Sequence, residues 1–162
     1  MPVKTTKLII MIEIERKFLV DTEMWCPKDS GNPIVQGYLS TDKERVVRVR
    51  IKGDKAWLTI KGKTQGISRI ELEYEIPVDE AEVLMKLCHD FPVRKKRYVE
   101  EINGMTWEID VFEDKNAGLV LAEVELNDEN EKIELPEWVT QEVSADHRYF
   151  NAWLSEHPFT TW

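Results

Sequence analysis

The segment that most constrains the fold is Met11–Val20, with the sequence MIEIERKFLV, because polar and apolar residues alternate along it. A period of two is typical of a β-strand and places Glu13, Glu15 and Lys17 on one face, opposite an apolar face. Two carboxylates followed by an ammonium group suit a divalent cation beside a phosphate, since the cation takes oxygen ligands and the lysine neutralises the anion. The same alternation is also typical of any strand with one solvated face, so this segment alone leaves both interpretations open.

The alternation recurs along the chain, which favours the functional interpretation. One face of each further predicted strand is charged or polar: Arg48, Arg50 and Lys52 in 46–52, Thr59, Lys61 and Lys63 in 57–63, Glu71, Glu73 and Glu75 in 70–76, Lys95 and Arg97 before Val99, Glu108 and Asp110 in 107–111, and Glu123 and Glu125 in 121–126. Several strands carry charges of one sign, and like charges repel unless charges of the opposite sign face them.

A closed sheet resolves this repulsion, because acidic and basic strands then face each other across a lumen, whereas an open sheet would expose the charge to solvent. The sequence therefore predicts an α+β fold: a closed or nearly closed antiparallel β-barrel of about eight strands, with a charged lumen. The apolar strand faces point outward in this arrangement and are expected to be covered by helices. Residues 11 to about 126 should form the barrel, with Glu13, Arg50, Lys61, Glu73 and Glu125 pointing inward.

The ordered set of these motifs resembles the CYTH, or triphosphate tunnel metalloenzyme, family. The resemblance rests on Glu13-x-Glu15-x-Lys17, Arg48-x-Arg50, Thr59-Ile-Lys61-Gly62, Glu71-x-Glu73, Lys95-x-Arg97, Glu108-x-Asp110 and Glu123-x-Glu125, in the family's order. The segment Ser144–Leu154 also looks like the closing helix of the small bacterial members. The one departure is an extra run before Met11, so we expect an N-terminal extension over residues 1–10, poorly ordered over 1–7, and a single tunnel domain over 11–162.

Composition limits the partners of the chain. The 162 residues suit one domain, and a formal net charge of −9 argues against general affinity for nucleic acid or acidic membranes. Two cysteines, Cys26 and Cys88, are too few for a disulfide framework, and the apolar run Leu8–Ile12 is too short to span a membrane or form a signal-peptide core. We therefore expect a cytoplasmic protein whose partner is a small-molecule triphosphate. A homodimer is a possible assembly.

Two helices are predicted outside the strands. The first begins near Pro77 with Asp79 as its N-cap, and its stripe of Ala81, Leu84, Leu87 and Cys88 should pack on the outside of the barrel. The second follows Ser144, a further N-cap candidate. Its packing residues, Phe150, Trp153 and Leu154, are expected in the core or as a plug at one end.

The charged residues divide by chemistry. A triphosphate carries about four negative charges and needs several cations, so substrate binding is assigned to the basic residues Lys17, Arg48, Arg50, Lys61, Lys95 and Arg97. Arg69, which precedes the acidic strand, and Lys52 are weaker candidates for the same role. Carboxylates cannot bind a polyanion directly, and they suit Mg²⁺ or Mn²⁺ instead, with Glu13, Glu15 and Glu125 as the metal set. The remaining carboxylates, Glu71, Glu73, Asp110 and Glu123, are candidates to position and deprotonate a water.

The resemblance implies metal-dependent hydrolysis of a triphosphate, and we expect inorganic tripolyphosphate to be the substrate because no element for holding a nucleobase is evident. The family also includes adenylate cyclases and nucleoside and thiamine triphosphatases, which are the alternatives. A non-catalytic polyphosphate- or nucleotide-binding module is a third possibility, although a pure anion binder would gain nothing from a lumen rich in glutamate.

A shortened chain tests the expected extension. Because the first motif strand begins at Met11, a chain starting there should fold and turn over tripolyphosphate like the full chain. Circular dichroism and phosphate release from the two chains would check this, and loss of either property on truncation would show that residues 1–10 belong to the domain.

Overall fold

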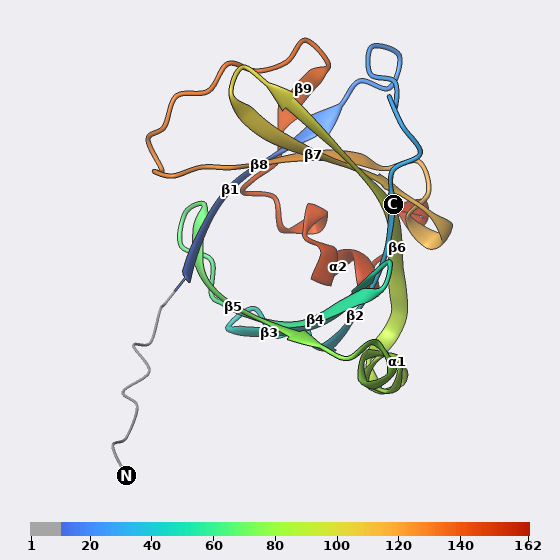
Figure 1. The fold of residues 1–162 in the computed structure, drawn as a ribbon. Coiled ribbons are helices and arrows are strands. Elements are labelled where there is room, and N and C mark those ends of the chain that lie inside the picture. The colour runs from blue at the N-terminus through green and yellow to red at the C-terminus, as the bar shows by residue number, and fades with distance from the viewer. Residues whose placement is uncertain (1–10) are drawn as a thin grey trace.

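The computed structural model describes residues 11–162, which form a single nine-stranded sheet. Its elements in chain order are β1 (Met11–Val20), β2 (Asn32–Ser40), β3 (Arg45–Lys52), β4 (Lys55–Gly62), β5 (Ser68–Ile76), α1 (Val78–Leu87), β6 (His89–Ile102), β7 (Met105–Phe112), β8 (Val120–Glu125), β9 (Val139–Glu142) and α2 (Asn151–Glu156), with short 3₁₀ turns at Asp114–Asn116, His147–Tyr149 and Phe159–Thr161. Figure 1, viewed along the axis, shows the strands as a ring.

The ring closes between β1 and β5. The strand order is β5-β4-β3-β2-β6-β7-β8-β1-β9, and β5 also pairs with the first half of β1, so β1 to β8 form a closed antiparallel barrel. The ninth strand, β9, pairs with the end of β1 at the rim. The predicted closed barrel over residues 11 to about 126 is therefore confirmed, with one strand more than expected.

The apolar strand faces point outward, as predicted, and the largest core cluster lies outside the barrel wall. It joins Phe18 of β1, Trp107 and Ile109 of β7 and Val124 of β8 with Trp138 of the connection after β8. The rings of Trp107 and Trp138 meet edge to face, with centroids 5.5 Å apart. This half of the barrel is covered by the two long connections after β1 and β8, drawn outside the ring in Figure 1, rather than by helices.

Helix α1 covers the opposite side of the barrel, where Ala81 packs against Val49 of β3 and Ala56 of β4. The predicted packing of this helix on the exterior is confirmed, but two details are wrong. The N-cap residue is Pro77, and Asp79 lies inside the first turn without capping it. Leu87 is exposed, because the ten-residue helix turns it away from the sheet.

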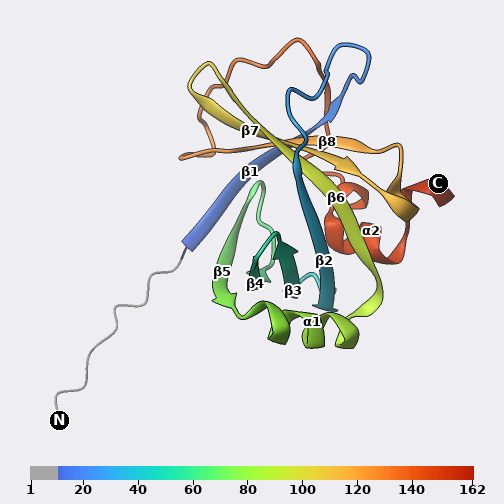
Figure 2. The same cartoon turned by 45° about the vertical axis from the view of Figure 1, so that its right-hand side comes forward.

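Helix α2 lies against the inner side of the barrel, so the expectation that the helices pack outside does not hold for it. Leu154 is fully buried with Val93, Phe112 and Leu121, three residues that continue the lumen-facing alternation of Lys95, Asp110 and Glu123 toward one end. Figure 1 shows α2 within the ring, and Figure 2 shows it beside β6. The predicted end plug is therefore present. Ser144 is not its N-cap, because its hydroxyl accepts from the backbone N–H of Lys17.

The predicted extension over residues 1–10, including its poor order over 1–7, lies outside the described residues, and the division of the chain into an extension and one domain stays a prediction. No helix in the range 11–162 is long and apolar enough to cross a membrane.

The close packing of α1 on β2 yields a stability prediction. A methyl group on Gly37 would lie 2.7 Å from Met85 Sδ and 2.8 Å from Cys88 Sγ, whereas one on Gly62 would approach no atom closer than 3.5 Å. Gly37→Ala should therefore lower the free energy of unfolding by about 1–3 kcal/mol, and Gly62→Ala should change it by less than about 1 kcal/mol. Urea denaturation of both variants measures this, and equal effects would show that α1 does not pack tightly at Gly37.

Candidate active site: a charged tunnel

The lumen holds a cavity of about 350 Å³ lined by side chains from every strand from β1 to β8. Thirteen of the fourteen predicted site residues line it: Glu13, Glu15, Lys17, Arg48, Arg50, Lys61, Arg69, Glu71, Glu73, Lys95, Arg97, Glu123 and Glu125. All five residues expected to point inward, from Glu13 to Glu125, are among them. The period-two alternation of the sequence is thus what positions the cavity wall.

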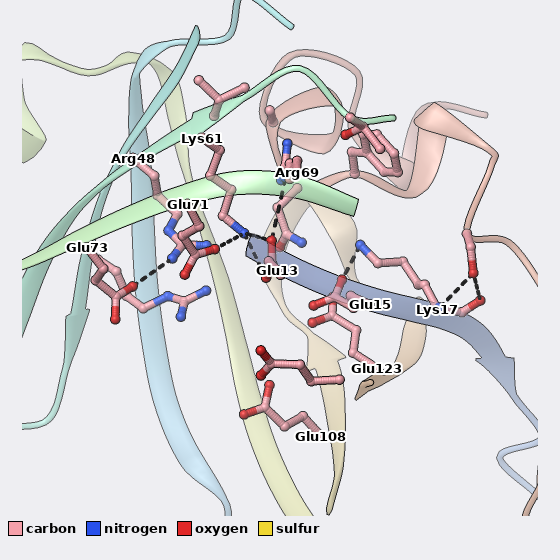
Figure 3. Close-up of a pocket in the computed structure, with 18 of the residues that line it drawn as sticks. Glu13, Glu15, Lys17, Arg48, Lys61, Arg69, Glu71, Glu73, Glu108 and Glu123 are labelled. Carbon is pink, nitrogen blue, oxygen red and sulfur yellow. Dashed lines mark hydrogen bonds and ion pairs between the residues drawn. The ribbon is translucent and has the colours of Figure 1, made fainter. Parts of the chain in front are cut away.

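On the β4–β5 side, Lys61 is the centre of an ion-pair cluster. Its Nζ lies 2.8 Å from Glu13 Oε2 and 2.7 Å from Glu71 Oε2, and Arg69 Nε lies 3.6 Å from the same Glu13 oxygen (Figure 3). Burial raises the pKa of Glu13, but the charge and hydrogen bond of Lys61 together with the charge of Arg69 hold it below its ordinary value. Glu13, predicted as a metal ligand, is therefore already neutralised by two cations.

Next to this cluster, Glu73 is held by two groups. Thr59 Oγ1 donates to Glu73 Oε2 at 3.0 Å, and Arg48 Nη2 lies 3.5 Å from the same oxygen. The Glu73 side chain is 38% exposed, so this pair lies at the accessible edge of the lumen.

Asp110 is the predicted site residue that the structure does not bring to the cavity. It is fully buried behind Lys95 and Arg97, with Lys95 Nζ at 2.6 Å and Arg97 Nε at 2.7 Å from its two oxygens. Burial raises its pKa, but the charges of Arg97 and Lys95 outweigh this and hold it below its ordinary value. Asp110 therefore positions the two cations, and its role in activating a water stays a prediction.

Glu123 is also paired, with Lys17 Nζ at 3.2 Å and Arg97 Nη2 at 3.5 Å. Burial opposes its ionisation, yet Lys17 and Arg97 hold its pKa well below the ordinary value. Glu123 is therefore an anion that orders two of the substrate-binding candidates.

Arg50 differs from the other lumen cations. Its Nε donates to Gln36 Oε1 at 3.1 Å, and among residues 11–162 it forms no ion pair. Burial, with the nearby charges of Arg48 and Arg97, lowers its pKa to about 10. A partly buried cation without a counter-ion costs free energy, and an anion entering the lumen would remove that cost.

Glu15 is the corresponding carboxyl group without a cation partner. It stands opposite Glu125 in the β1–β8 register and, within the described part of the chain, accepts no hydrogen bond from a cation. Burial first, and then the charge of Glu123, raise its pKa to about 8. Figure 3 shows Glu15, Glu108 and Glu123 gathered on one side of the lumen, with Arg48 and Lys61 across from them.

These carboxylates fit a divalent cation, because oxygen ligands and excess negative charge are what Mg²⁺ and Mn²⁺ require. The fit is partial. Among residues 11–162 no three His, Cys, Asp or Glu side chains form a ready-made metal cage. Since Mg²⁺ is usually bound by one or two carboxylates together with substrate phosphates, a bound polyanion would supply the missing ligands.

Several lumen residues were missed in the site assignment from sequence. Glu108 lines the cavity 2.5 Å from Arg97 Nη1, although its alternation with Asp110 was noted. Gln36 and Tyr38 of β2 are buried beside Arg50 and Arg48, and uncharged residues in that strand gave no signal. Asn151 of α2 accepts from Lys95 Nζ at 3.2 Å, a contact that only the folded plug creates.

A closed barrel whose lumen sets a basic wall against carboxylates defines a class of metal-dependent polyanion-binding tunnels. The family comparison gives the same class: residues 11–151 match the CYTH domain, and the chain belongs to the CYTH domain family.

Two relatives and a solved structure are similar over most of the chain. An inorganic triphosphatase of Acetivibrio thermocellus is 47% identical over 148 residues, covering 91% of this chain and 95% of the relative. An inorganic triphosphatase of Nitrosomonas europaea is 36% identical over 151 residues, covering 90% and 97%. The crystal structure of the inorganic triphosphatase NE1496 superposes with a TM-score of 0.64 at 34% identity, covering 88% of this chain and 97% of that one.

Buried Asp110 gives a prediction for acid stability. Its pKa in the folded chain lies below the ordinary 3.8, so the unfolded chain takes up the proton first as the pH falls. The stabilisation that ionised Asp110 gives the folded chain is fully present above about pH 5, and it is lost as the pH falls through the pKa of the folded state. Asp110→Asn should lower the free energy of unfolding at pH 7 by about 3–5 kcal/mol, because two buried cations lose their partner, and should flatten the dependence below about pH 5.

Thermal unfolding between pH 3 and 7 measures this effect, with Asp54→Asn in the exposed β3–β4 turn as the matched control. If the two variants behaved alike, Asp110 would not be paired as described.

Proposed function

We propose that this chain hydrolyses inorganic triphosphate to pyrophosphate and phosphate inside the tunnel, with Mg²⁺ or Mn²⁺ as cofactor. The observation that carries the proposal is that two ionisable groups without a counter-ion line one cavity, Arg50 on the basic wall and Glu15 on the acidic wall. A polyanion satisfies the first and a divalent cation the second. The inorganic triphosphatases among the similar proteins support the choice of substrate.

The basic wall binds and orients the phosphates. Arg50 is available without breaking an ion pair, whereas Lys17, Lys61 and Arg97 must share their charge with carboxylates. Because these cations are held by Glu123, Glu71 and Asp110, they are already positioned when the substrate enters, which favours transition-state stabilisation over mere binding. Arg48, Arg69 and Lys95 complete the proposed binding set.

The plug of α2 closes one end of the tunnel. Lys95 Nζ donates to Asn151 of α2, and Lys17 Nζ donates at 3.3 Å to the carbonyl oxygen of Tyr149 in the 3₁₀ turn before it. The plug and the turn that leads into it are therefore each bonded to a cation of the wall. We propose that the substrate enters from the opposite end and that the plug excludes water from the closed end.

Glu15 and Glu125 are the proposed metal ligands, and Glu13 stays a candidate that would have to give up its pair with Lys61. When bound, the metal ion would act as a Lewis acid on phosphate oxygens and lower the pKa of a bound water. Glu71 and Glu73 face the cavity and are the proposed groups to orient or deprotonate the attacking water. The basic wall then stabilises the phosphoryl group during in-line transfer.

A non-catalytic anion-binding module is disfavoured by the same geometry, because Glu15 and Glu125 would repel the ligand of a pure binder. A cytoplasmic location and a homodimer remain predictions from the sequence.

Substitution of the proposed metal ligands tests the catalytic role. Glu15→Gln and Glu125→Gln should each reduce phosphate release from tripolyphosphate by at least about tenfold, because metal ligation is lost while the basic wall stays. Their affinity for tripolyphosphate in EDTA should be retained. Glu82→Gln on the exposed side of α1 is the matched control. Activity at the wild-type level in both lumen variants would remove these residues from the metal site.

Substitution of Arg50 tests the binding role. Arg50→Ala should weaken tripolyphosphate binding by about 1.5–3 kcal/mol, the value of a charge-assisted contact. It should not destabilise the fold, because it removes a partly buried cation that has no counter-ion. Lys17→Ala should also weaken binding. Titration calorimetry measures both, with Arg94→Ala on the outer face of β6 as control. Unchanged affinity in the two lumen variants would contradict the proposed site.

A further inference from the structure

Strand β2 is the uncharged strip of the barrel's inner wall. Gln36 and Tyr38 lie on its inner side, whereas every other strand from β1 to β8 places at least one charged side chain in the cavity. Gln36 is fully buried, and the function proposed above assigns it no role. Burying an amide costs free energy unless its oxygen and its nitrogen are both hydrogen-bonded. An amide kept at this position must therefore have a partner at each end.

Both ends of the Gln36 amide are hydrogen-bonded. Oε1 accepts from Arg50 Nε at 3.1 Å, and Nε2 donates to the hydroxyl oxygen of Tyr38 at 3.0 Å. A guanidinium group only donates, so the amide oxygen must face it and the amide cannot turn over. Within residues 11–162, the two Nη groups of Arg50 make no hydrogen bond, and Arg50 lines the cavity. Gln36 thus holds the guanidinium through Nε and leaves both Nη groups to a ligand.

The register of the sheet gives Arg50 two uncharged neighbours. Its direct cross-strand partners are Gln36 in β2 and Trp57 in β4. Arg97 shows what an acidic neighbour does in this lumen, because its cross-strand partner is Asp110 and Arg97 Nε lies 2.7 Å from that carboxylate. A carboxylate at position 36 would therefore pair with Arg50 in the same way.

Shape does not account for an amide at position 36. A glutamate has the same shape, and it would accept from both Arg50 and Tyr38, since a hydroxyl group can turn to donate. The amide and the carboxylate therefore differ in charge. With a carboxylate there, Arg50 would share its charge as Arg97 does, and a polyanion would gain less from it.

We propose that Gln36 is a positioning residue that fixes the direction of the Arg50 guanidinium while leaving its full charge to the bound polyphosphate. This inference rests on the proposed polyanion-binding role of the tunnel and adds the residue that sets how strongly Arg50 acts in it. An amide suits this task, because it accepts a hydrogen bond as a carboxylate does but carries no charge to neutralise the cation.

Two substitutions separate position from charge. Gln36→Glu retains both hydrogen bonds and neutralises Arg50, whereas Gln36→Met has a similar length, loses both bonds and leaves the charge. Titration calorimetry of the full chain with tripolyphosphate in EDTA measures affinity without turnover, and urea denaturation measures stability. We expect the dissociation constant to rise about tenfold with Gln36→Glu and about two- to fivefold with Gln36→Met.

Affinity and stability should change in opposite orders. Gln36→Glu should be at least as stable as the wild-type chain, because Arg50 gains a counter-ion, and Gln36→Met should be less stable, because Arg50 and Tyr38 lose a partner. If Gln36 served packing alone, affinity would follow stability and the methionine variant would bind more weakly than the glutamate variant. That order, a glutamate variant with wild-type affinity, or one that does not fold, overturns the proposal.

Gln141→Glu on the exposed strand β9 is the matched control, since it adds the same charge outside the cavity. Its dissociation constant should stay within about twofold of wild type. Phosphate release from tripolyphosphate by the wild-type chain with Mg²⁺ is measured alongside. Its absence would contradict the proposed hydrolase activity, whereas the order of affinities in EDTA tests Gln36 by binding alone. A wild-type chain that bound no tripolyphosphate would overturn both.

Discussion

The structure depends on compensation of the charges that point into the barrel. Burying one ion without a partner costs several kcal/mol, and the lumen of this protein contains both signs in number. Closure of the sheet between β1 and β5 brings the two signs together, since it places Glu13 of β1 against Lys61 and Arg69. An open sheet would leave these groups without partners, so the charge pattern and the closed topology require each other.

The charged side chains that point into the barrel also determine where the hydrophobic core lies. With the lumen polar over most of its length, the apolar residues of the same strands must be buried outside, under α1 on one side and under the connections that carry Trp25 and Trp138 on the other. Only toward the plugged end does the inner face become apolar, through Phe112 and Leu121, and there α2 fills it. The barrel therefore has cores on its outer wall and a small one at its closed end.

Incomplete compensation is the feature that points to function. Most lumen ions are paired, and a fully paired lumen would have little affinity for a further ion. Arg50 without a carboxylate, and Glu15 and Glu125 without a cation, are the exceptions, and their pKa values are shifted in the directions that disfavour charge. Such groups reduce the stability of the empty protein, and a metal-bound polyanion would provide partners of both signs. The tunnel is in this respect prepared for a ligand that carries both signs.

Much of this could be predicted from the sequence because a strand's period of two assigns every residue to one face. Alternation alone placed Glu13, Arg50 and Glu125 correctly in the lumen. How deeply each lumen side chain is buried, and which side chain it pairs with, could not be predicted in this way. Asp110 and Glu108 share a face, yet only Glu108 reaches the cavity, because strand tilt and register decide which carboxylate is covered by Lys95 and Arg97. The second helix was predicted from the sequence, but the contact of its Asn151 with Lys95 arises only in the folded chain.

A structure of the protein crystallised with tripolyphosphate and Mn²⁺ tests the central claim most directly, because the anomalous signal of manganese locates the metal independently of the phosphates. The account predicts one manganese peak at the carboxylates of Glu15 and Glu125, and phosphate oxygens within hydrogen-bond distance of the Arg50 guanidinium. A metal bound elsewhere with Glu15 and Glu125 unliganded, or a tripolyphosphate bound outside the lumen, would contradict it.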